Sequence, residues 1–341
     1  MKLLLIKTSS MGDVIHTLPA LTDAKKAIPS LSVDWVVEEG FQAIPKWHDS
    51  VNRIVPVSLR RWRHHLFTKK TWQEWCEFYR ALRETEYDVI LDAQGLLKSA
   101  LLTRLGRSKH IIGLDSSSAR EPCAHHFYHQ KVTVDKTQHA ITRLRQLFCS
   151  AFNYALPDTP IDYGISKRLH QSKPSEAPYV VFLHGTTWAS KEWPENYWCQ
   201  LALLAVSAGW SIKLSGGNDF EIARANRIAS VSENIIVLPR LSIEQMADLL
   251  SSATAAVAVD TGFAHLAAAL NKPLIALFGA TSGELTGTIG INAKNLIATS
   301  PSCTPCLKRH CHYTLPSLVT PACYEALTPE RVWAAISASL S

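Results

Sequence analysis

The stretch that decides the fold is Met1–Lys25, MKLLLIKTSSMGDVIHTLPALTDAK. An apolar run, Leu3 to Ile6, leads into a short polar loop, Thr8–Asp13, and an apolar pattern with helical spacing follows. This order predicts a strand, a tight turn and a helix, the unit that opens α/β nucleotide-type domains. Asp13 lies where the strand's carboxyl end meets the helix, the edge at which ligands bind in open α/β sheets. Its carboxylate either caps the helix or serves a ligand.

The same unit recurs in the middle of the chain. Tyr179–His184 is a second apolar strand, Gly185–Lys191 is a second polar loop, and Pro194 suits the first turn of a helix. Two such starts in 341 residues, of which 47% are apolar, predict two α/β domains that each bury a core.

Strands and helices alternate along both halves, which predicts parallel, doubly wound sheets. In the first half we expect strands at 2–7, 32–37, 52–57, 88–91 and 110–112 and helices at 14–27, 71–86, 95–105 and 137–152, with 113–130 irregular. In the second half we expect strands at 179–184, 211–215, 234–238, 255–259 and 273–278 and helices at 194–208, from near Asn218, at 242–252 and at 262–270. Prolines punctuate a linker at 156–178, and the tail 328–341 reads as a helix. The expected domains are therefore 1–160 and 161–327, followed by the tail helix.

Composition narrows the class of protein. No stretch reaches the ~20 uncharged apolar residues of a membrane span, and Leu3–Ile6 is too short for a signal peptide. We therefore expect a soluble, cytoplasmic protein. The eight cysteines are not dense enough to demand disulfides.

Charge is divided unevenly between the halves. Residues 1–160 hold 22 Lys and Arg against 16 Asp and Glu, a net charge of +6, whereas 161–341 hold 13 of each. Much of the excess lies in 59–70, LRRWRHHLFTKK, which has five Lys or Arg and no acid. Such a segment suits an anionic partner, either a phosphorylated lipid or a membrane surface, or it is a solvated loop. Nucleic acid is the weakest option because no standard binding motif accompanies the patch.

Three junctions in the second half carry ligand-type residues. The strand 255–259 ends in Asp260-Thr261-Gly262, where a following helix offers free N–H groups to a phosphate. A Gly216-Gly217 pair precedes Glu221, an acid placed to bond ribose hydroxyls or to complement the helix dipole. Thr186, Thr187 and Lys191 offer hydroxyls and an ammonium to a pyrophosphate, although a loop lysine is also common in solvent. Together these junctions predict a nucleotide-diphosphate site.

Two further features carry weaker signals. Cys303-x2-Cys306-x4-Cys311, with Cys323 later, has part of a zinc spacing, but reduced cysteines in a packed loop explain it as well. His265 follows Gly262 on a helix and either faces the ligand or is structural.

Three motifs together resemble the bacterial ADP-heptose:lipopolysaccharide heptosyltransferases. They are KTSSMGDVIHTLPALTDA at the N-terminus, GTTWASKEWP after the central strand and VDTGFAHLAAAL near residue 260. The loop Thr8–Asp13 is similar to that of the type I enzymes, which add the first heptose of the inner core. The resemblance implies a GT-B fold, two Rossmann-like domains facing across a cleft, with the C-terminal helix packing back toward the first domain.

The resemblance also implies a metal-independent, inverting transfer from an ADP-heptose donor to a Kdo-lipid A acceptor, with no cofactor. It places the protein on the cytoplasmic face of the inner membrane as a peripheral protein. By motif position it makes Asp13 the general base and assigns the donor to Thr186, Thr187, Lys191, Glu221, Asp260, Thr261, Gly262 and His265. It makes Arg60, Arg63 and Arg120 candidates for the acceptor, to which the charge of the segment 59–70 adds Arg61. Ser10 and Gly12, in the same loop as Asp13, are further candidates.

Other readings stay open at this stage. The chain could be a heptosyltransferase of another core position, a sugar-nucleotide epimerase of similar architecture, or a nucleotide-binding module without activity. An enzyme of the proposed kind needs Asp13 to face the donor, whereas a mere binder does not need the basic, aromatic segment.

Overall fold

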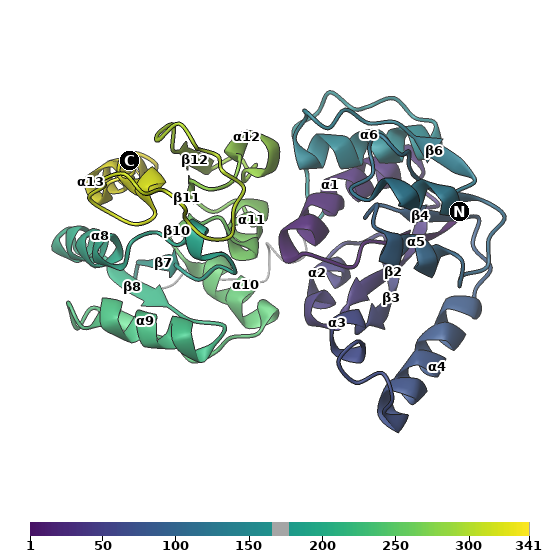
Figure 1. Cartoon of the computed structure of the whole chain (residues 1–341), viewed down its shortest axis with the longest axis horizontal. Coiled ribbons are helices and arrows are strands. Elements are labelled where there is room, and N and C mark those ends of the chain that lie inside the picture. The colour runs from purple at the N-terminus through teal and green to yellow at the C-terminus, as the bar shows by residue number, and fades with distance from the viewer. Residues whose placement is uncertain (166–176, 341) are drawn as a thin grey trace. The chain divides into compact units, whose positions relative to one another are not determined.

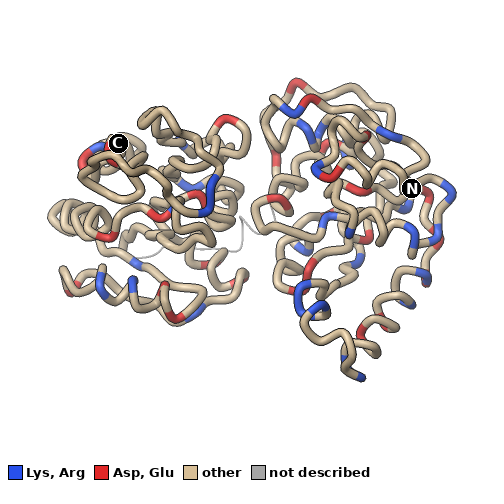
Figure 2. Tube along the Cα trace, viewed as in Figure 1, with Lys and Arg blue, Asp and Glu red and all other residues tan. Residues whose placement is uncertain are grey.

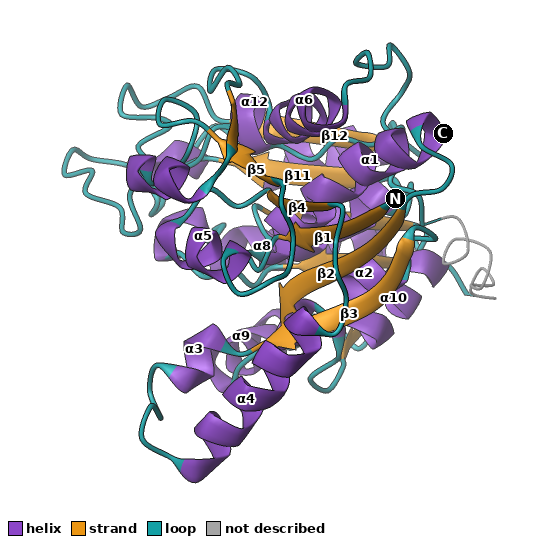
Figure 3. Cartoon of the chain, turned by 90° about the vertical axis from the view of Figure 1, so that its right-hand side faces the viewer, coloured by secondary structure: helices purple, strands orange, loops and turns teal. Residues whose placement is uncertain are grey.

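The computed structural model describes residues 1–165 and 177–340 and divides the chain into two compact units, Met1–Ser166 and Lys167–Ser341 (Figure 1). Each unit is a six-stranded parallel sheet with helices packed around it (Figure 3). The expected α/β class with two doubly wound domains is confirmed. No helix within the described ranges has the length and apolar character needed to cross a membrane.

The first unit has the strand order β3-β2-β1-β4-β5-β6. Its elements are β1 (Lys2–Ile6), α1 (Met11–Ala27), β2 (Ser32–Glu38), α2 (Ala43–Lys46), β3 (Val51–Val57), α3 (Leu59–Trp62), α4 (Lys69–Arg83), β4 (Val89–Asp92), α5 (Leu97–Thr103), β5 (Ile111–Leu114), β6 (Gln130–Val132) and α6 (Ala140–Phe152). The central strand β1 is apolar and buried between β2 and β4, as its run of leucines predicts.

The second unit repeats the same winding, with the order β9-β8-β7-β10-β11-β12. Its elements are β7 (Tyr179–Leu183), α8 (Glu195–Ser207), β8 (Ser211–Leu214), α9 (Asp219–Ala229), β9 (Ile235–Val237), α10 (Ile243–Ser252), β10 (Ala255–Val259), α11 (Gly262–Ala269), β11 (Leu274–Phe278), α12 (Gly283–Thr286), β12 (Ala293–Ile297) and α13 (Pro329–Ser337). In both sheets the order reverses beside the first strand, between β1 and β4 and between β7 and β10. Ligands of doubly wound sheets bind at such a switch point, outside the carboxyl ends of the strands.

Several expectations need correction. The region 113–130 is not wholly irregular, because β5 extends to Leu114 and an edge strand, β6, begins at Gln130. The second sheet has a further edge strand, β12, where none was expected. The basic segment 59–70 is not a plain loop, since it holds α3 and the start of α4.

Two segments lie next to the expected boundaries of the parts, namely the residues after 160 and the C-terminal helix. The first unit continues past residue 160, because Tyr163 and Ile165 are buried and Asp162 pairs with Lys26 at 3.0 Å. The rest of the expected linker, up to residue 176, lies outside the described residues. The C-terminal helix α13 packs on α8, and its buried Val332 and Ile336 belong to the core of the second unit.

Candidate functional site

Asp13 closes the first turn of α1 at the carboxyl end of β1. Its Oδ2 accepts a hydrogen bond from the Ser10 backbone N–H at 2.9 Å and another from the Ser10 hydroxyl at 2.7 Å. Its Oδ1 lies 3.7 Å from the ammonium of the buried Lys7, and the side chain is still 40% exposed. The cap and the ligand readings are therefore compatible, because one oxygen holds the turn while the side chain reaches solvent.

The surroundings of Asp13 are cationic. Burial alone would raise the pKa of Asp13. The positive charge of Lys7, the two hydrogen bonds from Ser10 and the charge of His16 outweigh burial and lower this pKa to about 2. Burial also lowers the pKa of the Arg143 guanidinium on α6, and the negative charge of Asp13 opposes that shift. Asp13 is consequently a carboxylate at every physiological pH.

The loop that carries Ser10 is fixed from the neighbouring strand across the switch point. Gln94, just after β4, accepts hydrogen bonds from the N–H groups of Thr8 and Ser9 at 3.0 and 3.2 Å. Its own Nε2 donates to the Ser9 carbonyl at 2.6 Å. Gln94 is in turn held by the buried Asp92, which accepts from the Gln94 N–H at 2.8 Å. Sequence reasoning missed this pair, whose only signal is a polar Asp-x-Gln at a strand end.

The expected acceptor residues have different environments. Gly12 lies in the first turn of α1, and Arg60 and Arg63 are exposed. Arg120 is exposed, and its backbone N–H lies beside Gly95 in the loop after β4, so it borders the Asp13 edge. Arg61 is partly exposed and forms ion pairs within the protein.

The Arg61 guanidinium is already engaged inside the protein. It pairs with Glu39 at 2.9 Å and with Glu74 at 2.8 Å, and it also donates to Ser58. The hydrogen bonds that the guanidinium donates to these two carboxylates raise its pKa above the ordinary value. Arg61 therefore ties α3 to α4 and to the end of β2, while its side chain stays 37% exposed.

In the second unit the loop after β7 and the end of β10 meet at the switch point. The Lys191 ammonium lies 2.7 Å from Asp260 Oδ2, and the two side chains are only 16% and 9% exposed. Thr281 donates to the same oxygen at 2.6 Å, and the Thr186 hydroxyl donates to the Asp260 carbonyl at 3.1 Å. Three of the predicted donor residues are thus joined in one network.

Glu221 lies at the same sheet edge, beside the loop after β7. Its carboxylate accepts from the Gly217 N–H at 2.7 Å, and a Cβ on Gly185 would come within 2.7 Å of it. A Cβ on Gly216 would meet the Ile222 backbone N at 2.6 Å. These glycines therefore make the space that brings the carboxylate next to Thr186.

The remaining predicted donor residues surround the start of α11. Thr261 is its N-cap and Gly262 its first residue, so the helix N–H groups are presented directly after Asp260. His265 is buried one turn further on, and Thr187 is exposed. Positive charge from Lys191 and the helix N-terminus converges on one edge, which suits a pyrophosphate.

Sequence reasoning missed two neighbours of Lys191. The indole of Trp188 lies 4.6 Å from the Lys191 ammonium and 5.8 Å from the exposed Arg309 guanidinium, so one ring carries two cations. Arg309 is held there because its carbonyl accepts from the Ser190 N–H at 3.1 Å. No local spacing links position 188 to 309, and only the folded chain reveals the pair.

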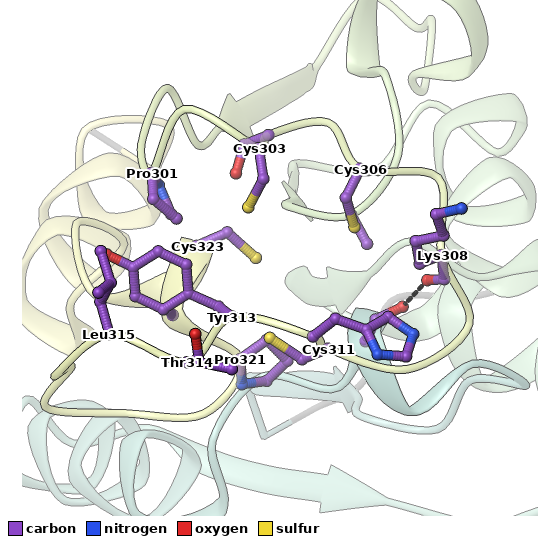
Figure 4. A pocket seen from close by; sticks show the side chains of 15 residues that line it. Pro301, Cys303, Cys306, Lys308, Cys311, Tyr313, Thr314, Leu315, Pro321 and Cys323 are labelled. Atoms are coloured by element: carbon purple, nitrogen blue, oxygen red, sulfur yellow. Dashed lines mark hydrogen bonds between the residues drawn. The ribbon is translucent and has the colours of Figure 1, made fainter.

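The four cysteines of the C-terminal region line one cavity of about 550 Å³ (Figure 4). Cys303, Cys306, Cys311 and Cys323 are all free thiols, and burial raises the pKa of Cys323 to about 12. Within residues 1–165 and 177–340 no group of three or more His, Cys, Asp or Glu side chains is arranged to hold a metal ion. The loop is joined to the chain next to the predicted donor residues. The Leu307 N–H donates to the carbonyl of Ala280 at 2.8 Å, and the following residue, Thr281, donates to Asp260.

The sequence is similar to a known family of glycosyltransferases and to two of its named members. The model of glycosyltransferase family 9 (heptosyltransferase) matches residues 75–315. Lipopolysaccharide heptosyltransferase 1 of Pseudomonas aeruginosa is 48% identical over 100% of this chain and 98% of its own length. The protein of that name from Salmonella typhimurium is 48% identical over 86% of this chain and 92% of its own.

Two solved structures of heptosyltransferases are similar to this chain in both fold and sequence. The E. coli heptosyltransferase WaaC with ADP superposes with a TM-score of 0.88 at 41% identity, covering 99% of this chain and 100% of that one. WaaC with ADP-2-deoxy-2-fluoro heptose gives a TM-score of 0.80 at 45% identity, covering 87% and 93%. The fold, the motifs and these similarities together show that the chain is an enzyme of glycosyltransferase family 9, the heptosyltransferases.

Proposed function

We propose that this enzyme transfers heptose from ADP-heptose to a Kdo residue of Kdo-lipid A, as a type I heptosyltransferase. The observation that carries the proposal is the network of Lys191, Asp260 and Thr186 at the switch point of the second sheet. High identity to proteins named lipopolysaccharide heptosyltransferase 1, and likeness to WaaC bound to ADP and to a fluorinated ADP-heptose, support it.

The second unit binds the donor in this proposal. Lys191, Thr186 and Thr187 take the pyrophosphate, and the N-terminus of α11 at Thr261 and Gly262 adds its dipole. Glu221 accepts from the ribose hydroxyls, as an acid one strand away does in dinucleotide sites. Asp260 and His265 complete the sugar-phosphate end of the site.

The first unit binds the acceptor. Arg60, Arg63 and Arg120 are exposed cations that suit the phosphates and the carboxylates of Kdo-lipid A. Ser10 and Gly12 line the loop that presents Asp13. Arg61 supports this surface from within through Glu39 and Glu74.

Asp13 acts as the general base. An acceptor hydroxyl attacks the anomeric carbon, its O–H proton passes to the Asp13 carboxylate, and the bond to the β-phosphate oxygen breaks as ADP leaves. A carboxylate with a pKa of about 2 is a weak base, but the attacking oxygen becomes acidic as it bonds to an oxocarbenium-like carbon. Displacement in a single step inverts the anomeric configuration.

Charge that develops on the leaving ADP is met by Lys191 and the α11 N-terminus, which can serve in place of a metal ion. The acceptor is a lipid, so we place the enzyme at the cytoplasmic face of the inner membrane as a peripheral protein. Transfer without a metal ion and location at the membrane are both parts of the proposal that membership of the family does not itself imply.

Incubation of the purified protein with ADP-heptose and Kdo-lipid A tests the proposal. We expect one heptose to be added per acceptor by mass spectrometry, with one ADP released and inverted anomeric configuration by NMR. An epimerase would change the donor without an acceptor, and a binding module would release no ADP.

A further inference from the structure

One segment of the first unit extends away from its sheet. Residues 59–83, which we call the arm, comprise α3, the connecting residues 63–68 and α4, and both views show α4 reaching out beyond β3 (Figures 1 and 3). At its tip Leu66 and Phe67 are 62% and 101% exposed. Large apolar side chains that are exposed together on a projecting element are typical of an interaction surface.

The inner side of the arm packs on the first unit through aromatic side chains. The Trp62 ring packs edge to face on Trp75 and Phe78, which are tilted against each other, with ring centroids 5.7 to 5.9 Å apart, and the Trp62 indole donates to Glu74 at 2.7 Å. Phe78 and Leu82 continue this contact into the core. The two helices of the arm are therefore joined to each other and to the core on this side.

A second apolar stripe runs along the outer side of α4. Trp72 is 67% exposed and Tyr79 is 39% exposed, and they follow the helical spacing of Trp72, Cys76 and Tyr79. A groove of about 420 Å³ lies along this stripe, lined by Trp72, Trp75, Cys76, Tyr79, Arg80 and Leu105. A helix with aromatic residues on one exposed side and basic residues beside them is typical of helices that lie in a membrane interface.

The charge of the arm is strongly positive. It holds seven Lys and Arg against two Glu, a net charge of +5 in a chain of net +6, and Figure 2 shows where they lie. The charge of Arg61 is balanced within the protein, because its guanidinium pairs with Glu39 and Glu74. Lys69, Lys70 and Arg80 remain exposed around Trp72.

We propose that the arm docks on an anionic lipid bilayer, with Phe67 and Trp72 inserted at the level of the headgroups and Lys69 and Lys70 on the headgroup charges. This deepens the proposed function, since it names the surface by which the enzyme reaches a membrane, and it rests on that function only for the choice of membrane. A second copy of the chain is a poor occupant, because a two-fold contact would place two arms of net charge +5 together.

Binding of the full chain to sedimented vesicles tests the proposal without any Kdo-lipid A. We expect binding to vesicles containing phosphatidylglycerol, weak binding to phosphatidylcholine alone, and release by salt. The double variant Phe67→Ser, Trp72→Ser should have an affinity for these vesicles at least about tenfold lower than that of the unaltered protein. The double variant Lys69→Gln, Lys70→Gln should lose vesicle affinity by a similar factor.

Matched controls come from the same chain. Ile291→Ser with Leu318→Ser removes two apolar side chains that are 80% and 85% exposed in the second unit, and this variant should bind as the unaltered protein does. Lys109→Gln with Lys136→Gln removes two exposed charges of the first unit outside the arm and should have the smaller effect. Circular dichroism and thermal unfolding show whether each variant is folded.

Each other outcome overturns the proposal. Equal loss in arm and control variants, or no binding to anionic vesicles, removes the arm as a membrane surface. Binding that requires Kdo-lipid A in the vesicle makes the groove an acyl-chain site of the acceptor, and concentration-dependent dimers abolished by Phe67→Ser make it a self-association surface. Transfer activity is measured separately, so a failure of the proposed function would show as lost transfer with vesicle binding intact.

Discussion

Replacing Lys191 by Met separates the two roles that the structure gives this side chain. Its ammonium lies 2.7 Å from Asp260 in a pair whose side chains are 16% and 9% exposed, and it stands where the donor's pyrophosphate is proposed to bind. The variant Lys191→Met keeps the length of the side chain and removes its charge. Both the stability of the fold and the affinity for ADP should fall.

The expected sizes follow from the contacts. Breaking one partner of a buried ion pair costs about 3–5 kcal/mol, because the other charge is left unpaired. Thr281 still donates to Asp260, so we expect a cost at or just below the lower limit of that range, about 2–3 kcal/mol in the free energy of unfolding. Loss of one charged contact to phosphate is worth about 1.5–3 kcal/mol, which predicts about 10- to 100-fold weaker ADP binding.

A second substitution distinguishes the two effects. In Lys191→Met with Asp260→Asn neither charge is left unpaired, so most of the stability should return while ADP binding stays weak. Urea denaturation measures the first quantity and isothermal calorimetry with ADP measures the second. The reasoning is refuted if the single variant binds ADP within about twofold of the unaltered protein, or if the double variant restores ADP binding together with stability.

Three further predictions concern the acceptor, the metal and pH. Arg60→Ala with Arg63→Ala should raise the KM for Kdo-lipid A and flatten its salt dependence, while the KM for ADP-heptose hardly changes; steady-state kinetics at low and high salt decide this. Activity should survive EDTA, and a loss restored by Mg²⁺ or Mn²⁺ contradicts the role of Lys191, whereas a loss restored only by Zn²⁺ points to the cysteine cavity. Burial lowers the pKa of His48 and of His184 to about 4, so the unfolded chain takes up these protons first as pH falls. Stability should therefore be full above about pH 6.5 and decline toward pH 4, by about 3 kcal/mol per histidine; thermal unfolding of His48→Gln, which should decline less, checks it.

Sequence periodicity was sufficient for the central strands of both sheets and for the edge strands β3 and β9, but it was insufficient for the edge strands β6 and β12. The strands β1, β7 and β10 are buried on both faces, so their sequences are short apolar runs that stand out. The edge strands β6 and β12 read Gln-Lys-Val and Ala-Lys-Asn-Leu-Ile, because one side of an edge strand faces solvent and needs no apolar side chains. Their pairing is decided by the sheet and not by their own composition.

In the candidate site, the sequence predicts individual residues but not the contacts between them. Junction residues such as Asp13, Lys191 and Asp260 are predictable because each follows a recognisable strand, and parallel strands end at one edge. That Lys191 and Asp260 form an ion pair, or that Gln94 holds the loop before Asp13, depends on which strands are neighbours. Arg61 was expected on the acceptor because composition counts its charge, but Glu39 and Glu74 approach it only in the folded chain.

The most direct test of the account compares Asp13→Asn with the unaltered enzyme in single-turnover transfer from ADP-heptose to Kdo-lipid A, with ADP affinity measured in parallel. The amide keeps the size of the side chain and cannot take the proton of the acceptor hydroxyl. We predict that heptose transfer slows by roughly 10²–10⁴-fold while ADP affinity is unchanged. Transfer at the original rate would contradict the account, because Asp13 would then serve only to cap α1.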